Sequence, residues 1–390
     1  MSSTADARNS HCRAQPHTAI RRQPALTERV SVLLPAHRLI PALTKGTSVI
    51  TKNATLPAIA AFVFVSLGLN GCAAPASSSP ESRGDVPVTI TIAEPVHGIG
   101  YLPLYAAIES GAFEEEGITV EVTTLTGGGH VSSVLSGEVF GFIGGVESGA
   151  VANVKGASLK GVVNVVNRGN VYFVAPEGEE PKAGEDLGKY FEGKTIVGGR
   201  HGGTPNAILR HILIESGLDP DTDTILQELE DSSAIPSAMN AGAADIAVVA
   251  EPQLGLGIAQ GLWGQPFLNV PAELGAYAYS SIVVPTKTID ENPGLIQRFV
   301  TALIKGQELI EGDPEYAFEL AQREFATLDP AALKATLDRA YEDELWDGSC
   351  LSKAAIETNL KVARAGKILD DSSIKQSYET VATMTFTGDC

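Results

Sequence analysis

The residue types best suited to bind a charged group lie together in the stretch GGRHGGTPNAILRHIL (198–213). A proline directly after Thr204 is typical of the first turn of a helix, so Gly203 and Thr204 lead into a helix N-terminus. Free backbone amides and the positive end of the helix dipole can bind a carboxylate, sulfonate or phosphate oxygen there. Arg200 and His201 add positive charge to the same loop. We therefore predict that this loop contacts a ligand; the alternative is that Thr204 only caps the helix.

Two glutamates occupy similar places in two similar segments. Glu147 and Glu251, 104 positions apart (251 − 147), each follow a helix, a turn rich in small residues and an apolar strand. We expect both to accept hydrogen bonds from N–H groups of a solute; the alternatives are exposure to solvent or pairing with Lys155 or another base. Paired carboxylates also serve acid–base catalysis, but no nucleophile, metal-ligand set, P-loop or cofactor fingerprint accompanies them. The sequence therefore predicts a protein that is not an enzyme and that uses neither a metal nor a cofactor.

Aromatic and small residues form a third group of candidates. In EPVHGIGYLPLYAAI (94–108), His97 can donate a hydrogen bond, Gly98 leaves room for a ligand, and the rings of Tyr101 and Tyr105 can cover it. Core packing is the alternative for Tyr105, and simple solvation is the alternative for His97. We predict that all four line a ligand site.

The turn GGGHVSSVL (127–135) adds glycines and hydroxyl groups. Gly128 and Gly129 let the backbone approach a ligand closely, and Ser132 can donate from its hydroxyl group. A flexible turn without a ligand is the alternative. Tyr277, at the start of YAYSSIVVPT (277–286), completes the predicted set.

These candidates follow strands in a repeating α/β pattern. Strands at 88–94 and 118–125 alternate with helices, and the β-α-β-α-β order predicts a parallel sheet with helices on both faces. A second set of the same kind runs from 194 to 252. Ligands of such sheets bind at the carboxyl ends of the strands. Extended segments at 170–178 and 277–286 are expected to connect the two sets.

The remaining part of the chain is mostly helical by its pattern. Asn292, Asp313 and Asp329 each stand directly before a proline, which predicts three helices with a capping side chain at the N-terminus. Apolar residues recur in these helices at spacings of three and four, so we expect them to pack on the first α/β set.

Charge and the N-terminal part restrict the function. The 390-residue chain has a formal net charge of −19, which argues against a general nucleic-acid-binding surface. Residues 1–71, in contrast, hold eight basic and two acidic residues and end in an apolar run that is too short to span a bilayer. This pattern predicts a signal peptide within 1–71. The alternative for the first part of this segment is an extension that is not translated, with translation starting downstream at a codon other than Met. The Ser/Pro-rich segment that follows (72–85) predicts a flexible tether.

A resemblance can now be stated. Leu69, Asn70, Gly71 and Cys72 resemble the lipobox of bacterial lipoproteins, in which the cysteine is lipidated. The chain resembles the type II solute-binding lipoproteins of ABC importers. The stretches that carry this resemblance follow the lipobox in the order GYLPLYAAIESGAFEEEGITVEV, GGGHVSSVLSGEVFGFIGG, GKTIVGGRHGGTPNAILRHIL and GAADIAVVAEP. The nearest group serves sulfonates, nitrate, taurine and thiamine pyrimidine precursors.

The resemblance implies a two-lobed α/β fold of the type II periplasmic-binding-protein kind, with a two-strand hinge and a ligand cleft between the lobes. Lobe 1 is expected to comprise 86–175 plus 278–390, and lobe 2 to comprise 176–277. It also implies a monomer outside the cytoplasm, anchored to the cell membrane by palmitate and related acyl chains on Cys72. Its partners would be a small solute and an ABC transporter permease, with no nucleic acid.

Cysteine usage fits an exported protein. Cys12 lies in the part that would be removed and Cys72 would carry lipid, which leaves Cys350 and Cys390. In an oxidising compartment, two remaining cysteines predict one disulfide.

The predicted function is capture of a small anionic or nitrogen-containing solute by cleft closure and its delivery to a permease. A thiamine pyrimidine precursor or similar heteroaromatic ligand is the first alternative. An enzyme and a sensory lipoprotein that works without a transporter are further alternatives. Eukaryotic pyrimidine synthases share this fold family but depend on a cysteine-rich motif that the mature chain lacks.

Overall fold

A computed structural model describes residues 87–370 and 376–388. The first of its two β-sheets holds the strands that we predict near the start of the folded part. The predicted signal peptide (1–71), the predicted tether with Cys72 (72–85) and Cys390 lie outside the described residues. The signal peptide, the tether, the lipid anchor and the disulfide of Cys350 with Cys390 therefore stay predictions.

The strand order of the first sheet is β2-β1-β3-β10-β4. β1 (Val88–Glu94) pairs in parallel with β2 (Ile118–Thr124) and β3 (Gly141–Gly144), as the α/β pattern predicts. β10 (Ala276–Pro285) returns from the second sheet and pairs antiparallel with both β3 and β4 (Leu159–Arg168).

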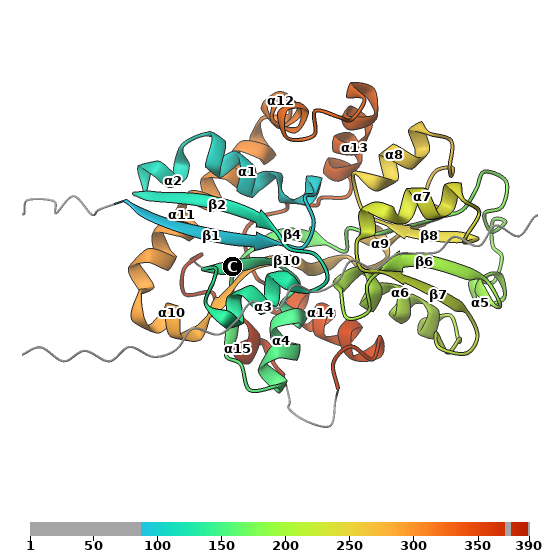
Figure 1. Cartoon of the computed structure of the whole chain (residues 1–390), viewed down its shortest axis with the longest axis horizontal. Helices are drawn as coiled ribbons and strands as arrows, with labels where there is room; N and C mark the ends of the chain where they lie inside the picture. The colour runs from blue at the N-terminus through green and yellow to red at the C-terminus, as the bar shows by residue number, and fades with distance from the viewer. Residues whose placement is uncertain (1–86, 371–375, 389–390) are drawn as a thin grey trace, which may run out of the picture. The chain divides into compact units, whose positions relative to one another are not determined.

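Alternation along the strands divides the core of this sheet between its two faces. Ile92 and Ile143 belong to one apolar cluster, whereas their neighbours Ala93 and Phe142 belong to another. Helices α1 (Leu102–Glu109), α2 (Ala112–Glu115) and α11 (Pro293–Gly312) cover the first face. Helices α3 (Gly129–Ser136), α4 (Val146–Val154), α14 (Lys353–Ala365) and α15 (Tyr378–Val381) cover the second (Figure 1).

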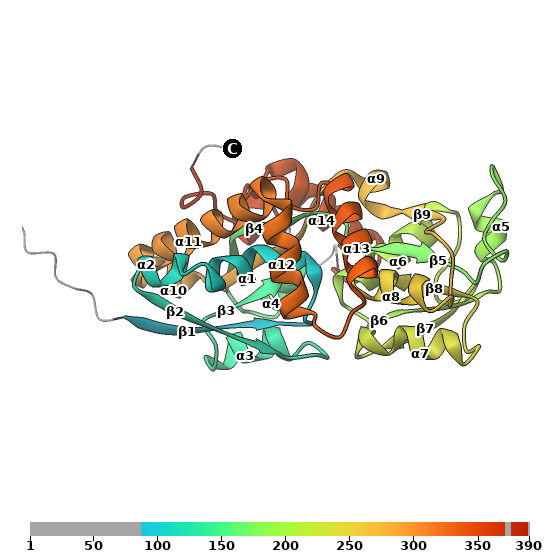
Figure 2. The same ribbon diagram turned by 90° about the horizontal axis from the view of Figure 1, so that it is seen from above.

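The second sheet has the order β7-β6-β8-β5-β9. Its parallel strands are β7 (Ile225–Leu229), β6 (Thr195–Gly199) and β8 (Ile246–Val249), and its antiparallel strands are β5 (Tyr172–Val174) and β9 (Leu268–Asn269). Helix α6 (Thr204–Glu215) packs on one face, and α7 (Ile235–Asn240) and α8 (Gln253–Ala259) lie over the other (Figures 1 and 2). Short helices α5 (Leu187–Phe191) and α9 (Val270–Leu274) complete this part.

The two segments expected to connect the sets are themselves strands of the sheets. Residues 172–174 form β5 of the second sheet, although they precede the predicted lobe boundary at 175/176, because Tyr172 and Phe173 pair with β8 and are fully buried. Residues 276–285 form β10 of the first sheet. The crossings therefore lie at 169–171 and at Gly275, and the lobe boundaries as such stay a prediction.

The C-terminal helices confirm two of the three predicted caps. Asp313 accepts hydrogen bonds from the first amides of α12 (Pro314–Glu324), and Asp329 does the same for α13 (Pro330–Glu342). The prediction for Asn292 is wrong: short α10 (Thr286–Glu291) leads directly into α11, and the Asn292 side chain caps neither.

The packing prediction is confirmed for α11 and α12, which lie on α1 of the first sheet. It needs correction for α13, which contacts α12 but also α8 of the second sheet. No helix among residues 87–370 and 376–388 is long and apolar enough to cross a membrane.

Candidate functional site

A cavity of about 100 Å³ lies at the carboxyl ends of the parallel strands of both sheets. The first sheet and its loops contribute Pro95, Val96, Tyr101, Gly127, His130, Gly144, Gly145, Ser148, Tyr279 and Ser280. The second contributes Gly199, Arg200, Gly203, Thr204, Pro205, Leu229, Glu230 and Ser232. Both walls of the cavity are thus built where α/β sheets bind ligands.

The N-termini of two helices lie at this cavity. Helix α6 begins at Thr204, directly after Gly203. Gly203 has an extended backbone (φ −90°, ψ 157°) and, being glycine, has no side chain that could cap the helix. Helix α4 begins after Gly145, which provides none either. Gly145, Gly203 and Thr204 all line the cavity. Neither N-cap residue therefore caps its helix with a side chain, although the Glu147 carboxylate accepts a hydrogen bond from its own backbone amide in the first turn of α4. The positive ends of two helix dipoles lie at the cavity.

Thr204 differs from its predicted role. It is the first residue of α6 rather than the cap, and its hydroxyl group donates a hydrogen bond to Glu147 Oε1. Glu147 is fully buried, and its other oxygen accepts from Asn359 Nδ2 at 2.6 Å. Burial raises the pKa of Glu147. Both carboxylate oxygens are therefore engaged within the protein, and Glu147 is not among the residues that line the cavity.

Arg200 supplies the cationic side chain of the cavity. Its Nη1 donates to the backbone oxygen of His201 at 3.1 Å. Its guanidinium lies against Gly128: a Cβ atom added to Gly128 would be 3.5 Å from Arg200 Cζ. Gly128 has a φ of 85°, a conformation that glycine adopts without strain. Burial lowers the pKa of Arg200, and the charges of Glu230 and Glu147 oppose that shift. A guanidinium remains protonated at neutral pH in any case.

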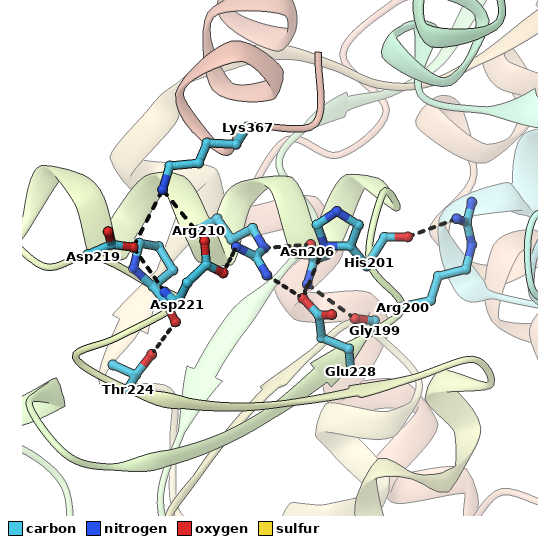
Figure 3. A network of polar contacts seen from close by, with 11 residues as sticks. Gly199, Arg200, His201, Asn206, Arg210, Asp219, Asp221, Thr224, Glu228 and Lys367 are labelled. Carbon is cyan, nitrogen blue, oxygen red and sulfur yellow. Dashed lines mark hydrogen bonds and ion pairs between the residues drawn. The ribbon is translucent and has the colours of Figure 1, made fainter. Parts of the chain in front are cut away.

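A network of charged side chains behind the Arg200 loop fixes its base (Figure 3). Glu228 Oε1 accepts from Asn206 Nδ2 at 2.9 Å and from Arg210 Nη2 at 2.8 Å. Arg210 Nη1 donates to Asp221 at 2.7 Å. His201 turns toward the same carboxylate, with Nδ1 3.3 Å from Glu228 Oε1, and its side chain is 57% exposed. His201 therefore supports the loop and borders a groove outside the cavity.

Glu251 lies in a separate buried ion pair. Its carboxylate accepts from Arg339 Nη1, from the Gly255 amide at 2.9 Å and from Thr336 Oγ1 at 3.1 Å. It does not line the cavity. The structure thus shows the alternative of pairing with a base, with Arg339 in place of Lys155, and it does not bring Glu251 and Glu147 to one site.

The predicted tyrosines have different surroundings. Tyr101 lines the cavity, and Ser280 Oγ donates to its hydroxyl oxygen at 3.5 Å. Tyr105 is a core residue, as its alternative predicts, and donates to Glu94 Oε2 at 2.5 Å. Tyr277 is completely buried, and its hydroxyl group has no partner in the part of the chain that the structure describes. Tyr279, which sequence reasoning missed, takes the cavity position.

His97 and Gly98 lie beside the cavity rather than in its wall. The His97 ring packs between Tyr105 and Phe325, with Nδ1 3.2 Å from Glu94 and Nε2 3.5 Å from Glu324. The hydrogen bond to Glu94 raises the pKa of His97, and the charges of Glu94 and Glu324 add to this. Gly98 is buried and faces the backbone oxygen of Glu251. A Cβ atom added to Gly98 would be 3.7 Å from that oxygen.

The 127–135 turn contributes residues other than those predicted. Gly127 and His130 line the cavity, whereas Gly128 and Ser132 border the neighbouring groove. Gly129 packs against Leu125, and Ser132 Oγ donates to the Gly129 backbone oxygen at 3.0 Å. His130 also lines the cavity, and sequence reasoning missed it although it stands in the middle of the predicted motif.

The amino-acid sequence is similar to a known protein family and to a protein of Bacillus subtilis. The family described as "NMT1/THI5 like" matches residues 99–317. The "Putative binding protein YtlA" of Bacillus subtilis (strain 168) is 28% identical over 254 residues, which are 64% of this chain and 75% of that protein.

Two solved structures with low sequence identity share the fold. The alkanesulfonate-binding protein SsuA from Xanthomonas axonopodis pv. citri, bound to MOPS, matches with a TM-score of 0.60 and 17% identity. The match covers 76% of this chain and 99% of SsuA. The periplasmic nitrate-binding protein NrtA from Synechocystis PCC 6803 matches with a TM-score of 0.61 and 14% identity, over 73% of this chain and 83% of NrtA. Because the family match covers more than half of the chain, the protein belongs to the NMT1/THI5-like family, and it has the type II periplasmic-binding-protein fold.

Proposed function

We propose that this protein is an extracytoplasmic solute-binding protein that holds a small oxyanion of the sulfonate or nitrate kind in the cavity between its two sheets. One observation carries the proposal: the N-termini of α4 and α6, which begin after glycines, and the Arg200 guanidinium all lie at the same cavity. An anion there receives charge-assisted hydrogen bonds from groups already in place.

The charge of the whole chain makes such local groups necessary. With a formal net charge of −19, the long-range field repels an anion. Arg200 and the two helix dipoles supply positive potential at short range, where the partly buried surroundings weaken it least. Ser148 and Ser232 also line the cavity and can add hydroxyl donors.

A negatively charged wall extends the choice of solute to aminosulfonates. Glu230 lines the cavity and is exposed to solvent. A taurine-like solute would place its sulfonate at Arg200 and its ammonium group at Glu230. The names of the alkanesulfonate- and nitrate-binding structures support this class of solute for the shared fold.

A heteroaromatic solute is the second candidate. Tyr101 and Tyr279 line the cavity, and Glu230 can accept from an amino group. An aminopyrimidine such as a thiamine precursor would stack on these rings. This candidate needs neither Arg200 nor the helix N-termini, so the two candidates differ in which substitutions weaken binding.

We propose binding rather than catalysis because the two carboxylates that acid–base chemistry would need lie in separate places with their oxygens engaged. A sensory lipoprotein with the same fold would bind the same solute but would need no permease. We propose that the solute is delivered to an ABC permease, with a monomeric receptor held at the membrane through Cys72.

A thermal-shift screen tests the proposed function. Methanesulfonate, nitrate, taurine and an aminopyrimidine are added in Bis-Tris or Tris, because sulfonate buffers such as MOPS would compete. A bound ligand at 100 times its Kd adds about 2.7 kcal/mol of stability. Stabilisation by at least one anion supports the proposal, whereas stabilisation by the aminopyrimidine alone favours the second candidate.

A further inference from the structure

His130 occupies a position in the cavity wall that the contacts of the folded chain do not explain. It is the second residue of α3, its side chain is 3% exposed, and it lines the cavity opposite the α6 loop. Its Nδ1 is buried and has no hydrogen-bond partner among residues 87–370 and 376–388. Its Nε2 lies beside Gly144, another residue of the cavity wall. Buried polar atoms in folded proteins are nearly always paired, so an unpaired ring nitrogen at a ligand cavity indicates a missing partner.

The groups around the ring are apolar or positively charged. Phe142 of β3 meets it edge-on, with ring centroids 5.3 Å apart, and Leu125 presents its backbone oxygen from the loop before α3. Arg200 faces it from the second sheet. The other titratable side chains of the cavity wall are Glu230, Tyr101 and Tyr279. Burial and the Arg200 charge together lower the pKa of His130 to about 4, so the ring of the empty protein is neutral at pH 7.

Resting on the anion-binding function proposed above, we propose that His130 contacts the bound anion through a ring N–H and takes up one proton from solvent when the anion binds. Burial is the larger cause of the neutral ring, and an anion beside Arg200 offsets the second cause, the Arg200 charge. The anion also offers an acceptor to Nδ1, which has no partner among the described residues. Both effects favour the imidazolium form. The anion then lies between two cations, one from each sheet, which links anion binding to closure of the cavity.

The sign of the pH dependence follows from this. The pKa of His130 is higher with anion bound than in the empty protein, so the complex holds more protons between these two pKa values. Affinity for the anion therefore rises as pH falls through that interval, by up to about tenfold per pH unit. Below a pH of about 4 the empty protein is protonated as well, and the gain ends.

Direct measurement of proton uptake tests the proposal. Sodium methanesulfonate or sodium nitrate, neither of which titrates at pH 5 to 7, is added to the purified protein in unbuffered solution on a pH-stat. The acid needed to hold pH 5 is expected to approach about one proton for each anion bound, and to fall at pH 7. His130→Gln should bind the anion at least tenfold more weakly and take up no proton, whereas His201→Gln should retain the uptake.

The results of this experiment separate the inference about His130 from the proposed function. Anion binding without proton uptake in the wild-type protein overturns the inference about His130 and leaves the proposed function standing. Uptake that persists in His130→Gln overturns it too, because another group then titrates. If neither anion binds, the proposed function fails first. Should His130→Gln not fold, ring nitrogen NMR shifts of the wild-type protein decide, since they must move toward the imidazolium values at pH 5 when the anion is added.

Discussion

The Thr204 hydroxyl group, at the first residue of α6, donates a hydrogen bond to the fully buried carboxylate of Glu147 in α4. The two helices belong to different sheets and both start at the cavity. Asn359 of α14 holds the second oxygen of the same carboxylate. One buried acid thus joins the second sheet, the first sheet and the C-terminal helices at the proposed anion site.

Replacing Thr204 by Val should destabilise the protein. Valine has nearly the same shape but no hydroxyl group, so Glu147 loses one of its two side-chain donors while it stays buried. The expected loss is about 1–3 kcal/mol of the free energy of unfolding. Urea denaturation of the variant, with Thr204→Ser as the control that keeps the hydroxyl group, measures it. Equal stability of the Val and Ser variants would show that the bond contributes nothing.

The ion pair of Glu251 should matter for stability and not for the ligand. Replacing Arg339 by Met leaves a buried carboxylate without its counter-ion, at an expected cost of about 3–5 kcal/mol. Anion affinity of the folded variant, measured by titration calorimetry, should remain within about twofold of the wild type, because neither residue lines the cavity. If Arg339→Met lost much of its anion affinity without a loss of stability, Glu251 would instead belong to the anion site.

These residues mark the limit of what the sequence could predict. Arg200, Gly203 and Thr204 were placed at the cavity by local signals alone: a strand, a glycine-rich turn and a proline in the first helical turn. Glu251 shows the same local pattern as Glu147, but its partner Arg339 is 88 positions away in the chain. No local spacing reveals such a partner.

The aromatic residues illustrate the same limit. Tyr277 and Tyr279 stand two positions apart on one strand, and the register of β10 shifts between Ala276 and Ser280. Because of that irregularity, the pattern of the strand could not tell which ring is buried and which lines the cavity. His130 was missed for a different reason. The prediction for the 127–135 turn named its glycines and Ser132 and assigned no role to His130, which lies in the first turn of α3.

The surface and interior members of the network in Figure 3 should contribute unequally. The Arg210 side chain is 7% exposed and bonds to Asp221 and Glu228, so Arg210→Met should cost about 1.5–3 kcal/mol. The Lys367 side chain is 55% exposed and lies 3.4–3.5 Å from Asp219 and Asp221, so Lys367→Met should cost less than about 1 kcal/mol. Urea denaturation of both variants compares the two. Similar losses would mean that burial does not decide the strength of these pairs.

His97 should make stability depend on pH. Its folded-state pKa lies above its ordinary value of 6.5, chiefly because of the hydrogen bond to Glu94. The protonated ring therefore adds stability that is fully present below pH 6.5 and is lost as pH rises through the folded-state pKa. Urea midpoints from pH 5.5 to 8.5 should fall more steeply for the wild type than for His97→Gln. Parallel curves would assign the dependence to other groups.

The role of Arg200 is the most direct test of the proposed function. Titration calorimetry in Bis-Tris at pH 7 compares methanesulfonate and nitrate binding to the wild-type protein and to Arg200→Gln, with His201→Gln as the control from the same loop. A charge-assisted hydrogen bond of about 1.5–3 kcal/mol corresponds to a loss of about 10- to 150-fold in affinity for Arg200→Gln. We expect that loss, and nearly unchanged affinity for the control. An anion that binds Arg200→Gln as tightly as the wild type would contradict the assignment of this cavity as the anion site.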